Sequence, residues 1–448
     1  MAPRRPKLLF LAPSAYTLGG VQEWLAQLIP DLQDRDWPVT LALPAGQWHD
    51  FERYRDRYPS LPALPLGNPS GSRAGRRRGV AALLREQQPD LVLGVNLGDL
   101  YPAAWQERHA GHFHGRVAMT LHGFVPTLLA DLQAHRPVID AVIATNQLTC
   151  SLCHTQANIP SERILYAPYG VNPDPYPTLT DPTPDSPLKL AWVGRLDQDQ
   201  KRVHDLPGIM DELDRIGIVA QLSIAGGGTE EASLRAALAP RLQSGQVRLL
   251  GHLTPEELGE LVYQNHDVLL ITSSWETGPI VAWEAMAAGL AVVSSRYVGS
   301  GLEGALRADV TALLFPVGDA TTAAAQLARL QDPQLRGQLR RAGRQLVQQR
   351  YGRDQSCQAW EQAFERCLNL PPLACPPAVP PLPPQGRLDR WVGSNRAEDL
   401  RRLLGIRFQH TSPGGEWPHA LHSGACDEET LLTLAAALEA ALEAEEGS

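Results

Sequence analysis

Long apolar runs, basic charge and cysteine are all scarce in this sequence of 448 residues. No uninterrupted apolar run is long enough to cross a bilayer, so we expect no transmembrane helix. The 40 lysines and arginines are outnumbered by 49 aspartates and glutamates, and the formal charge of −9 gives no reason to expect a nucleic-acid partner. The composition, with 43% hydrophobic and 20% charged residues, is typical of a folded soluble protein.

The six cysteines include one pair with a suggestive spacing. Cys150, Cys153 and His154 form the C-x-x-C-H pattern of covalent haem attachment. That chemistry requires export, whereas this segment lies between an apolar run and an expected helix, so we favour thiols on the first turn of a helix. A structural zinc ion would need a second ligand pair, and none is paired nearby in the sequence.

The N-terminus, MAPRRPKLLFLAPS, resembles the start of a signal peptide because basic residues precede a short apolar run. The continuation, TLGGVQEWLAQLI, favours a strand, turn and helix over a cleavage site. We therefore expect a cytoplasmic chain in which most cysteines are reduced.

Short apolar strands alternate with amphipathic helices, which predicts parallel sheets covered on both faces. Strands are expected at 8–11, 39–43, 91–95, 117–121, 141–144 and 164–167, and again, after a proline-rich stretch, at 188–193, 221–225, 247–250, 268–271 and 291–294. The expected fold class is α/β, with two doubly wound, Rossmann-like domains that face each other. Ligands would bind in the cleft, beyond the carboxyl ends of the strands.

We place the two domains at residues 1–172 and 187–353. A helix at 354–370 could cross back to the first domain, and a proline-rich linker occupies 371–386. The tail, 387–448, has no catalytic signature and an unknown function; helices are expected at 388–404 and 427–445.

Glycines mark two turns from strand to helix. Gly19 and Gly20 open the first helix, and Gly226–Gly228 follow a strand of the second domain. Glycine there lets backbone N–H groups approach an anion at the positive end of a helix. Turn geometry alone is an equally common reason for glycine at such positions.

Two cations, Arg195 and Lys201, flank the loop after strand 188–193. Together they could clamp a diphosphate, although an isolated pair would be better explained as solvated charge. Asp197 and Asp199 form a D-x-D pattern between the cations. We expect these carboxylates to shape the loop, and we assign no metal.

The stretch ITSSWETGPIVAWEAMAAG carries two carboxylates, Glu276 and Glu284. Glu276 lies in the loop after strand 268–271, and Glu284 lies on the next helix, whose first amides, on Ile280 and Val281, have no intrahelical partner. Carboxylates beside free amides and cations could bind a polyol diphosphate. Without those neighbours, two surface glutamates would be the better explanation.

His122, just past strand 117–121, could orient a hydroxyl, but alone it is better explained as structural.

As a set, these pieces resemble the GT-B glycosyltransferases of the family 4 type. The resemblance covers about residues 7–369, with a poor match over 47–90. It rests on the Gly19-Gly20 turn, His122, ILYAPYGVN, VGRLDQDQK, IAGGG, VRLLGHLTPEEL and the E-x7-E pattern from Glu276 to Glu284.

The resemblance implies a retaining transfer of a sugar from a nucleotide-sugar to an acceptor hydroxyl, without a metal or other cofactor. Arg195 and Lys201 would hold the diphosphate and stabilise the leaving group, Glu276 would contact donor-sugar hydroxyls, and His122 would lie near the transferred sugar. The departing phosphate oxygen would take the acceptor proton on the same face, so catalysis would be mainly positioning and charge stabilisation. The remaining donor contacts would come from Gly19, Gly20, Gly226, Gly227, His252, Leu253, Gly278, Ile280, Val281 and Glu284.

Two departures from the family pattern leave the donor open. The segment VGSGLEGA at 298–305 varies the usual G-G-x-x-E, although Gly299 and Glu303 remain. Trp283 stands where smaller aliphatic residues are common. The donor base, the sugar, the linkage, the acceptor and the oligomeric state stay open.

Two other functions are compatible with the fold. The chain could be a sugar-nucleotide epimerase or a non-catalytic sugar-nucleotide-binding protein. Because a binder does not need a leaving-group clamp, the joint presence of Arg195, Lys201, Glu276 and Glu284 favours the transferase.

The segment SRAGRRRG could touch the inner membrane face through Arg73, Arg76, Arg77 and Arg78, but its glycine and serine favour a flexible, solvated loop.

Overall fold

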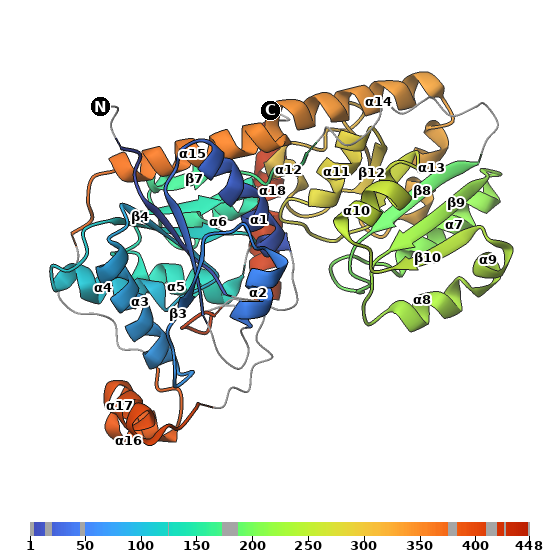
Figure 1. The fold of residues 1–448 in the computed structure, drawn as a ribbon. Helices are drawn as coiled ribbons and strands as arrows, with labels where there is room; N and C mark the ends of the chain where they lie inside the picture. Colours follow the sequence, from blue (N-terminus) through green and yellow to red (C-terminus); the bar gives the residue numbers. More distant parts are fainter. Residues whose placement is uncertain are drawn as a thin grey trace. The chain divides into compact units, whose positions relative to one another are not determined.

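The computed structural model describes residues 4–13, 20–44, 50–123, 125–172, 187–374, 383–408, 419–424 and 427–446. The chain divides into two compact units (Figure 1). Unit 1 comprises Met1–Ala167 and Cys357–Leu431. Unit 2 comprises Pro168–Ser356 and Leu432–Ser448.

Unit 1 is built on a seven-stranded parallel sheet with the order β3-β2-β1-β4-β5-β6-β7. Its central strands are fully buried because helices cover both faces of the sheet (Figure 1). The strands are β1 (Leu8–Leu11), β2 (Val39–Pro44), β3 (Ala63–Leu66), β4 (Leu91–Val95), β5 (Arg116–Leu121), β6 (Ala141–Ala144) and β7 (Ile164–Tyr166).

The helices of unit 1 fall between consecutive strands, as a doubly wound sheet requires. They are α1 (Gly20–Asp34), α2 (Phe51–Arg57), α3 (Arg73–Gln87), α4 (Leu100–His109), α5 (Pro126–His135), α6 (Gln147–Thr155) and the short 3₁₀ turn η1 (Ser161–Arg163).

Unit 2 contains a six-stranded parallel sheet with the order β10-β9-β8-β11-β12-β13. Two apolar clusters pack against its two faces, one around Leu190 and Phe315 and one around Trp283 and Met286. The strands are β8 (Leu188–Val193), β9 (Ala220–Ala225), β10 (Val247–Gly251), β11 (Val268–Ile271), β12 (Ala291–Ser295) and β13 (Leu313–Phe315).

The helices of unit 2 alternate with these strands. They are α7 (Asp205–Arg215), α8 (Glu231–Ala237), α9 (Ala239–Ser244), α10 (Pro255–Glu257), the π-helical turn η2 (Leu258–Tyr263), α11 (Ile280–Ala288), α12 (Ser300–Glu303), α13 (Ala320–Arg329), α14 (Pro333–Leu346) and the π-helical turn η3 (Val347–Tyr351).

The long helix α15 (Arg353–Asn369) begins among the residues of unit 2 and continues in unit 1. Within unit 1, Trp360 packs on Trp24 with ring centroids 4.7 Å apart, and Phe364 packs on Phe10 at 6.1 Å. Glu361 accepts hydrogen bonds from Arg35 and from Trp37. The helix is therefore an integral part of unit 1 from Cys357 onward.

Two strands were missing from the expected pattern, and both lie at sheet edges. The strand β3, with the sequence ALPL, contains a proline and is only partly buried, so its pattern is weak. The strand β13 has three residues. Cys150 and Cys153 are free thiols on the helix α6, as predicted, but only Cys150 lies in its first turn; Cys153 is buried one turn later. Within the described part of the chain, none of the helices combines the length and hydrophobicity needed to cross a bilayer.

The basic segment 72–79 is not the flexible loop that its glycines suggest. It forms the start of α3, with Ser72 as N-cap, its hydroxyl accepting from the Gly75 amide at 2.9 Å. Arg76 is buried in an ion pair with the fully buried Asp99. Arg76 is therefore unable to touch a membrane.

The tail belongs to unit 1 as far as Leu431, and its remainder belongs to unit 2. Instead of one helix at 388–404 it forms α16 (Arg387–Val392) and α17 (Ser394–Leu404), separated by Gly393 at φ +82°. Glu398 of α17 is fully buried and accepts hydrogen bonds from Ser70 (2.6 Å) and Ser72 (2.5 Å). The last helix, α18 (Glu428–Glu446), buries Leu431 and Ala435. Most of the proline-rich linker, residues 375–382, lies outside the described residues.

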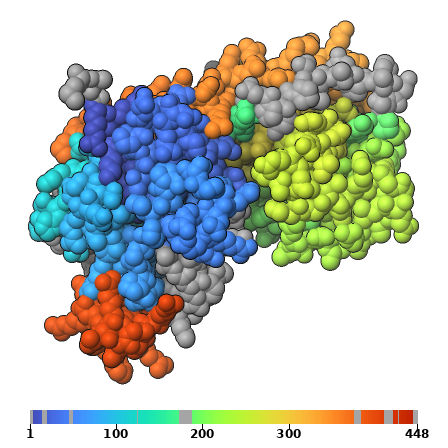
Figure 2. Space-filling model, in the orientation of Figure 1, coloured from blue at the N-terminus to red at the C-terminus, as the bar shows by residue number. Residues whose placement is uncertain are grey.

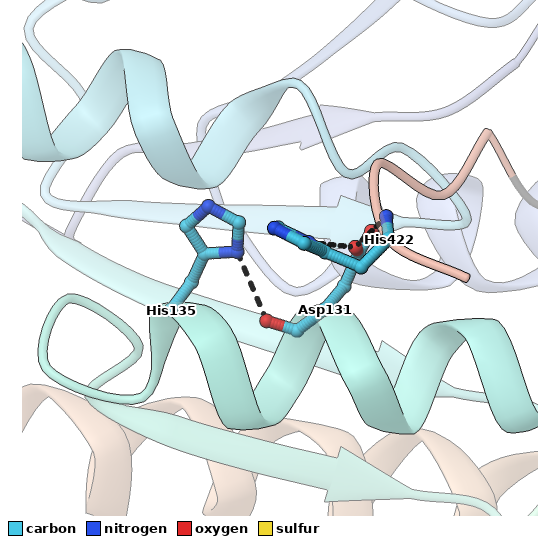
Figure 3. A group of neighbouring side chains, drawn as sticks. All are labelled: Asp131, His135 and His422. Atoms are coloured by element: carbon cyan, nitrogen blue, oxygen red, sulfur yellow. Dashed lines mark hydrogen bonds and ion pairs between the residues drawn. The ribbon is translucent and has the colours of Figure 1, made fainter. Parts of the chain in front are cut away.

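A second tail contact joins residues 419–422 to unit 1 (Figure 3). The Asp131 carboxylate of α5 accepts the Leu421 and His422 amides and the His422 Nδ1 at 2.8 Å. His135, one turn along α5, donates from Nδ1 to the Asp131 carbonyl at 3.0 Å. These three residues are of metal-ligating type and lie close together. The hydrogen bonds already account for their proximity, so the group is a docking contact for the tail.

Candidate functional site

The candidate residues of unit 2 lie at one edge of its sheet. Arg195 and Lys201 follow β8, Gly226–Gly228 follow β9, His252 and Leu253 follow β10, and Glu276 follows β11. These four strands are consecutive neighbours in the parallel sheet. Their carboxyl ends therefore meet at the same edge, where open α/β sheets bind ligands.

Lys201 and Glu276 form an ion pair at this edge. The Lys201 ammonium lies 2.5 Å from Glu276 Oε1, and the side chains are 17% and 6% exposed. Ser273 donates a second hydrogen bond to the same carboxylate oxygen at 2.6 Å. Glu276 is therefore buried against a cation and a hydroxyl, which offset the cost of burying a carboxylate in this apolar stretch.

The backbone of Lys201 is held by two further contacts. Thr272 donates to the Lys201 carbonyl at 2.6 Å and accepts from the Trp192 indole at 3.0 Å. Asp197 accepts the amides of Gln200 (2.9 Å) and Lys201 (2.7 Å). The prediction that Asp197 shapes the loop is confirmed.

Arg195 lies at the exposed rim of the site. Its side chain is 62% exposed and donates to Gln200 Oε1 at 2.6 Å. Gln200 in turn donates to the carbonyl of Trp275, next to Glu276. Arg195, which also lies 3.4 Å from Asp197 Oδ2, therefore belongs to the same loop network as Glu276, and its guanidinium is accessible to a ligand.

The three glycines after β9 have different roles. A Cβ on Gly226, at φ +135°, would lie 1.8 Å from the Gly194 carbonyl oxygen, and one on Gly228 would lie 2.4 Å from that of Leu196. The Gly226 amide already donates to the Gly251 carbonyl at 2.7 Å. Close packing of neighbouring loops therefore explains Gly226 and Gly228, whereas Gly227 has open space at its Cβ position.

Glu284 lies on α11, which begins at Ile280 directly after Gly278 (φ +88°) and Pro279. Tyr263 of the π-helical turn η2 donates to the Glu284 carboxylate at 2.7 Å. Burial raises the pKa of Glu284 to about 7, and the Tyr263 hydrogen bond partly opposes this shift. Val281, the second residue of α11, is half-buried.

The unusual tryptophan before Glu284 points into the core. Trp283 is buried and stacks on Tyr351 with centroids 4.1 Å apart and planes at 6°. Its size is therefore accommodated by η3, away from the loops that carry Lys201 and Glu276. This departure from the family pattern does not alter the candidate site.

His122 of unit 1 packs against the first helix. His122 follows β5, and its ring lies 4.5 Å from that of Trp24, on the helix that Gly20 begins. His122 Nε2 lies 3.0 Å from Thr120 Oγ1, and burial lowers the pKa of His122 to about 3. The ring is therefore neutral at pH 7. Gly19 lies outside the described residues.

The residues that sequence reasoning missed are those that hold the candidates in place: Gln200, Tyr263, Thr272 and Ser273. Each makes a hydrogen bond to a predicted residue or to its loop. Ser273 has a weak sequence signal, since it lies three positions before Glu276. Tyr263 has none, because only the fold places it beside Glu284.

Two family models match the chain in succession. The description "Glycosyltransferase Family 4" matches residues 18–175, and "Glycosyl transferases group 1" matches residues 181–346. The chain belongs to the GT-B glycosyltransferases of the family 4 type.

Curated relatives match only part of the chain. The amylovoran biosynthesis glycosyltransferase AmsK of Erwinia amylovora is 27% identical over 267 residues, which cover 56% of this chain and 63% of AmsK. Glycogen synthase of Mycobacterium tuberculosis is 33% identical over 159 residues, which cover 36% of this chain and 38% of that enzyme. The match thus spans less than two thirds of each relative.

Solved structures share the fold over most of the chain. The lipopolysaccharide outer core galactosyltransferase WaaB superposes with a TM-score of 0.66 at 18% identity, covering 80% of this chain and 99% of WaaB. The HepE protein of Anabaena, solved in complex with UDP and glucose, superposes with a TM-score of 0.63 at 18% identity, covering 81% and 100%. At these identities the likeness establishes the GT-B fold.

Proposed function

We propose that this protein is a retaining glycosyltransferase that moves a sugar from a nucleotide-sugar to an acceptor hydroxyl. The observation that carries the proposal is the buried Lys201–Glu276 ion pair at the ligand-binding edge of unit 2. A cation for phosphate and an acid for sugar hydroxyls are here held in one contact, with Arg195 exposed on the same loop.

The ion pair has a natural role in donor binding. When a diphosphate arrives, its oxygens compete for the Lys201 ammonium, and Glu276 becomes available to accept hydrogen bonds from sugar hydroxyls. Arg195 adds a bidentate donor from the rim. As the bond to the sugar breaks, negative charge grows on the diphosphate, and these fixed cations stabilise it most in the transition state.

We further propose that the acceptor attacks from the face that the diphosphate leaves. The departing phosphate oxygen takes the proton of the acceptor hydroxyl, a bond forms between that hydroxyl oxygen and the anomeric carbon, and the configuration is retained. His122, which is neutral at pH 7, can orient a hydroxyl by hydrogen bonding but contributes no charge.

No metal is required in this scheme. The Asp197 carboxylate of the D-x-D pattern is already bonded to two backbone amides, which supports a role in loop structure. Transfer is expected to be unchanged by EDTA. A loss of activity in EDTA that magnesium or manganese restores would refute metal independence.

The proposed donor is a UDP-sugar. The support is the UDP bound in the HepE structure, which has the same fold. A thermal-shift screen of UDP-, GDP- and ADP-sugars tests the proposal, because a ligand that binds only the folded state raises the melting temperature. A shift confined to GDP- or ADP-sugars would reject the UDP assignment.

The decisive experiment compares Glu276→Gln with Glu256→Gln, a control on the exposed helix α10. Release of UDP from the donor should fall about 100-fold in the first variant, because a transition-state contact is lost, and stay unchanged in the second. Circular dichroism verifies the fold of both. Full turnover in Glu276→Gln would reject the site, and an inverted product by NMR would reject retention.

The cytoplasmic location, with an approach to the inner membrane face, stays a prediction. Since Arg76 is buried, a membrane contact would depend on Arg73, Arg77 and Arg78.

A further inference from the structure

A pocket of about 540 Å³ lies within unit 1, between α3, α4 and the tail helix α17. Figure 2 shows the tail helices as a separate mass seated against the part of unit 1 that contains α3. None of the candidate donor or catalytic residues lines this pocket, so it is a different feature. Its charged and polar lining includes Arg77, Arg78, Arg85, Arg402, Ser394 and Asn395.

The residues that line the pocket carry more positive than negative charge. Four arginines line it against a single carboxylate, Glu107. Three of the arginines have partners: Arg78 binds Asp399 at 2.5 Å, Arg402 binds Glu398 at 2.6 Å, and Arg85 binds Glu107 at 3.4 Å. Arg77 has no ion pair or hydrogen bond with any residue that the structure describes.

The two carboxylates that act electrostatically on Arg77, Asp99 and Asp389, are already paired with other arginines. Asp99 is paired with Arg76, and Asp389 is paired with Arg401 at 2.5 Å. Arg73 and Arg78 add like charge on the same helix, and burial lowers the pKa of Arg77. A half-buried guanidinium lowers stability when the neighbouring carboxylates are paired with other arginines. A bound anionic ligand would supply the missing negative charge.

The tail completes the pocket with polar groups. Ser394 and Asn395 form the first turn of α17, an eleven-residue helix whose N-terminal end carries partial positive charge. Arg78 is fixed by the Asn395 carbonyl at 2.8 Å. Guanidinium, hydroxyl and amide groups are the donors with which proteins hold phosphate.

We infer that this pocket binds a small phosphorylated molecule or free phosphate, with Arg77 as the principal counter-charge and α17 as the wall that completes the site. The tail, which lies outside both family matches, thereby acquires a function. The pocket favours a compact anion over a bilayer surface, because its arginines line a hollow and Arg77 is half-buried. The inference goes beyond the proposed transfer reaction and does not depend on it.

The test measures binding of inorganic phosphate and of glucose 6-phosphate to the full chain by isothermal titration calorimetry at constant ionic strength. Four proteins are compared: wild type, Arg77→Gln, Arg55→Gln and Lys201→Met. Arg55 is an exposed arginine on α2 of the same unit, so its variant removes equal charge at an unrelated place. Lys201→Met shows whether the probes bind at the candidate donor site of unit 2, because their affinity would then fall in this variant.

At least a tenfold loss of affinity in Arg77→Gln, with affinity kept in the two other variants, supports the pocket. Loss in Lys201→Met together with full binding by Arg77→Gln overturns it, as does failure of the wild type to bind either probe. Anionic and neutral vesicles form a further arm. Binding to anionic vesicles that needs Arg77, without binding of a soluble probe, would assign these arginines to a membrane surface and also overturn the proposal.

A second measurement separates a ligand-binding from a structural role. Arg77→Met should raise the melting temperature in ligand-free buffer, because it removes an uncompensated charge, and should abolish the upward shift that phosphate causes in the wild type. Arg55→Met should leave the shift intact. A lower melting temperature for Arg77→Met without ligand would identify Arg77 as a structural residue and contradict the proposal.

Discussion

At the scale of single residues, Lys201 and Glu276 matter to stability as well as to function. Each neutralises the other in a setting from which water is largely excluded. Burying either charge alone is costly, whereas removing both is far less so.

Lys201→Met should therefore destabilise unit 2 by about 3 kcal/mol, because it leaves the Glu276 carboxylate buried without its cation. The double variant with Glu276→Gln should recover most of that loss. Urea unfolding measures both. Arg235→Met, which breaks an exposed pair on α8, is the matched control and should cost less than about 0.5 kcal/mol. Equal losses in the single and double variants would contradict the coupling.

Glu284 gives a pH prediction. Its folded pKa of about 7 lies above its ordinary value of 4.5. Between these pH values the folded state holds a proton that the unfolded state has lost. The contribution of Glu284 to the free energy of unfolding therefore falls as pH rises from 4.5 to 7. Glu284→Gln should remove this part of the pH dependence of urea unfolding.

The same titration should affect donor binding. If the Glu284 carboxylate accepts ribose hydroxyls, UDP-sugar affinity should rise between pH 6 and pH 8. The affinity of Glu284→Gln should be flat over this range, while Glu256→Gln should follow the wild type. A wild-type affinity that is constant from pH 6 to 8 would argue against a ribose contact by the ionised carboxylate.

At the scale of elements, the contact between α3 and α17 depends on a few polar atoms. Ser72 caps α3 and also donates to the buried Glu398 of the tail. One hydroxyl therefore supports a helix end and a contact between segments far apart in the sequence.

Ser72→Ala should lower the free energy of unfolding by about 2 kcal/mol. The substitution removes the helix cap and one hydrogen bond to a buried carboxylate. Denaturant unfolding of unit 1 measures the loss. Ser233→Ala, at an exposed position on α8, should change stability by less than about 0.5 kcal/mol. A Ser72→Ala protein as stable as this control would show that α17 does not need the hydroxyl.

Elements with a strong hydrophobic pattern in the sequence were predictable. Elements whose bounds depend on contacts with other parts of the chain were not. The strands β1, β4, β6, β8 and β11 and the helix α11 have the expected bounds, because each is a compact apolar run between clear turn signals. Expected ends of other strands differ by one residue. The tail helix 388–404 was wrong because a single glycine, Gly393, adopts a left-handed conformation between two helices.

At the scale of the whole molecule, acid should weaken unit 1 through two histidines, the buried His135 and the half-buried His122. Burial lowers the pKa of His135 to about 4 and that of His122 to about 3. As pH falls below 6.5, these histidines become protonated in the unfolded chain but stay neutral in the folded chain. The free energy of unfolding therefore falls.

His135→Gln should therefore reduce the loss of stability between pH 7 and pH 5. Urea midpoints at both pH values measure it, with the exposed His114→Gln as control. Because tryptophans such as Trp24 and Trp283 lie in different units, unfolding should be followed with a probe that is confined to unit 1. An equal pH dependence in His135→Gln and the wild type would contradict the assignment.

The sequence by itself determined the α/β class, the alternation that builds both sheets, and the candidate residues at strand ends. It did so because periodicity, turn residues and helix starts are local properties of the chain. Only the tertiary structure decided that Lys201 is paired with Glu276, that Tyr263 holds Glu284, and that Arg76 is buried while Arg77 lines a pocket with the tail. These contacts join residues up to several hundred positions apart, and burial and pairing depend on which elements pack together, which no local pattern encodes.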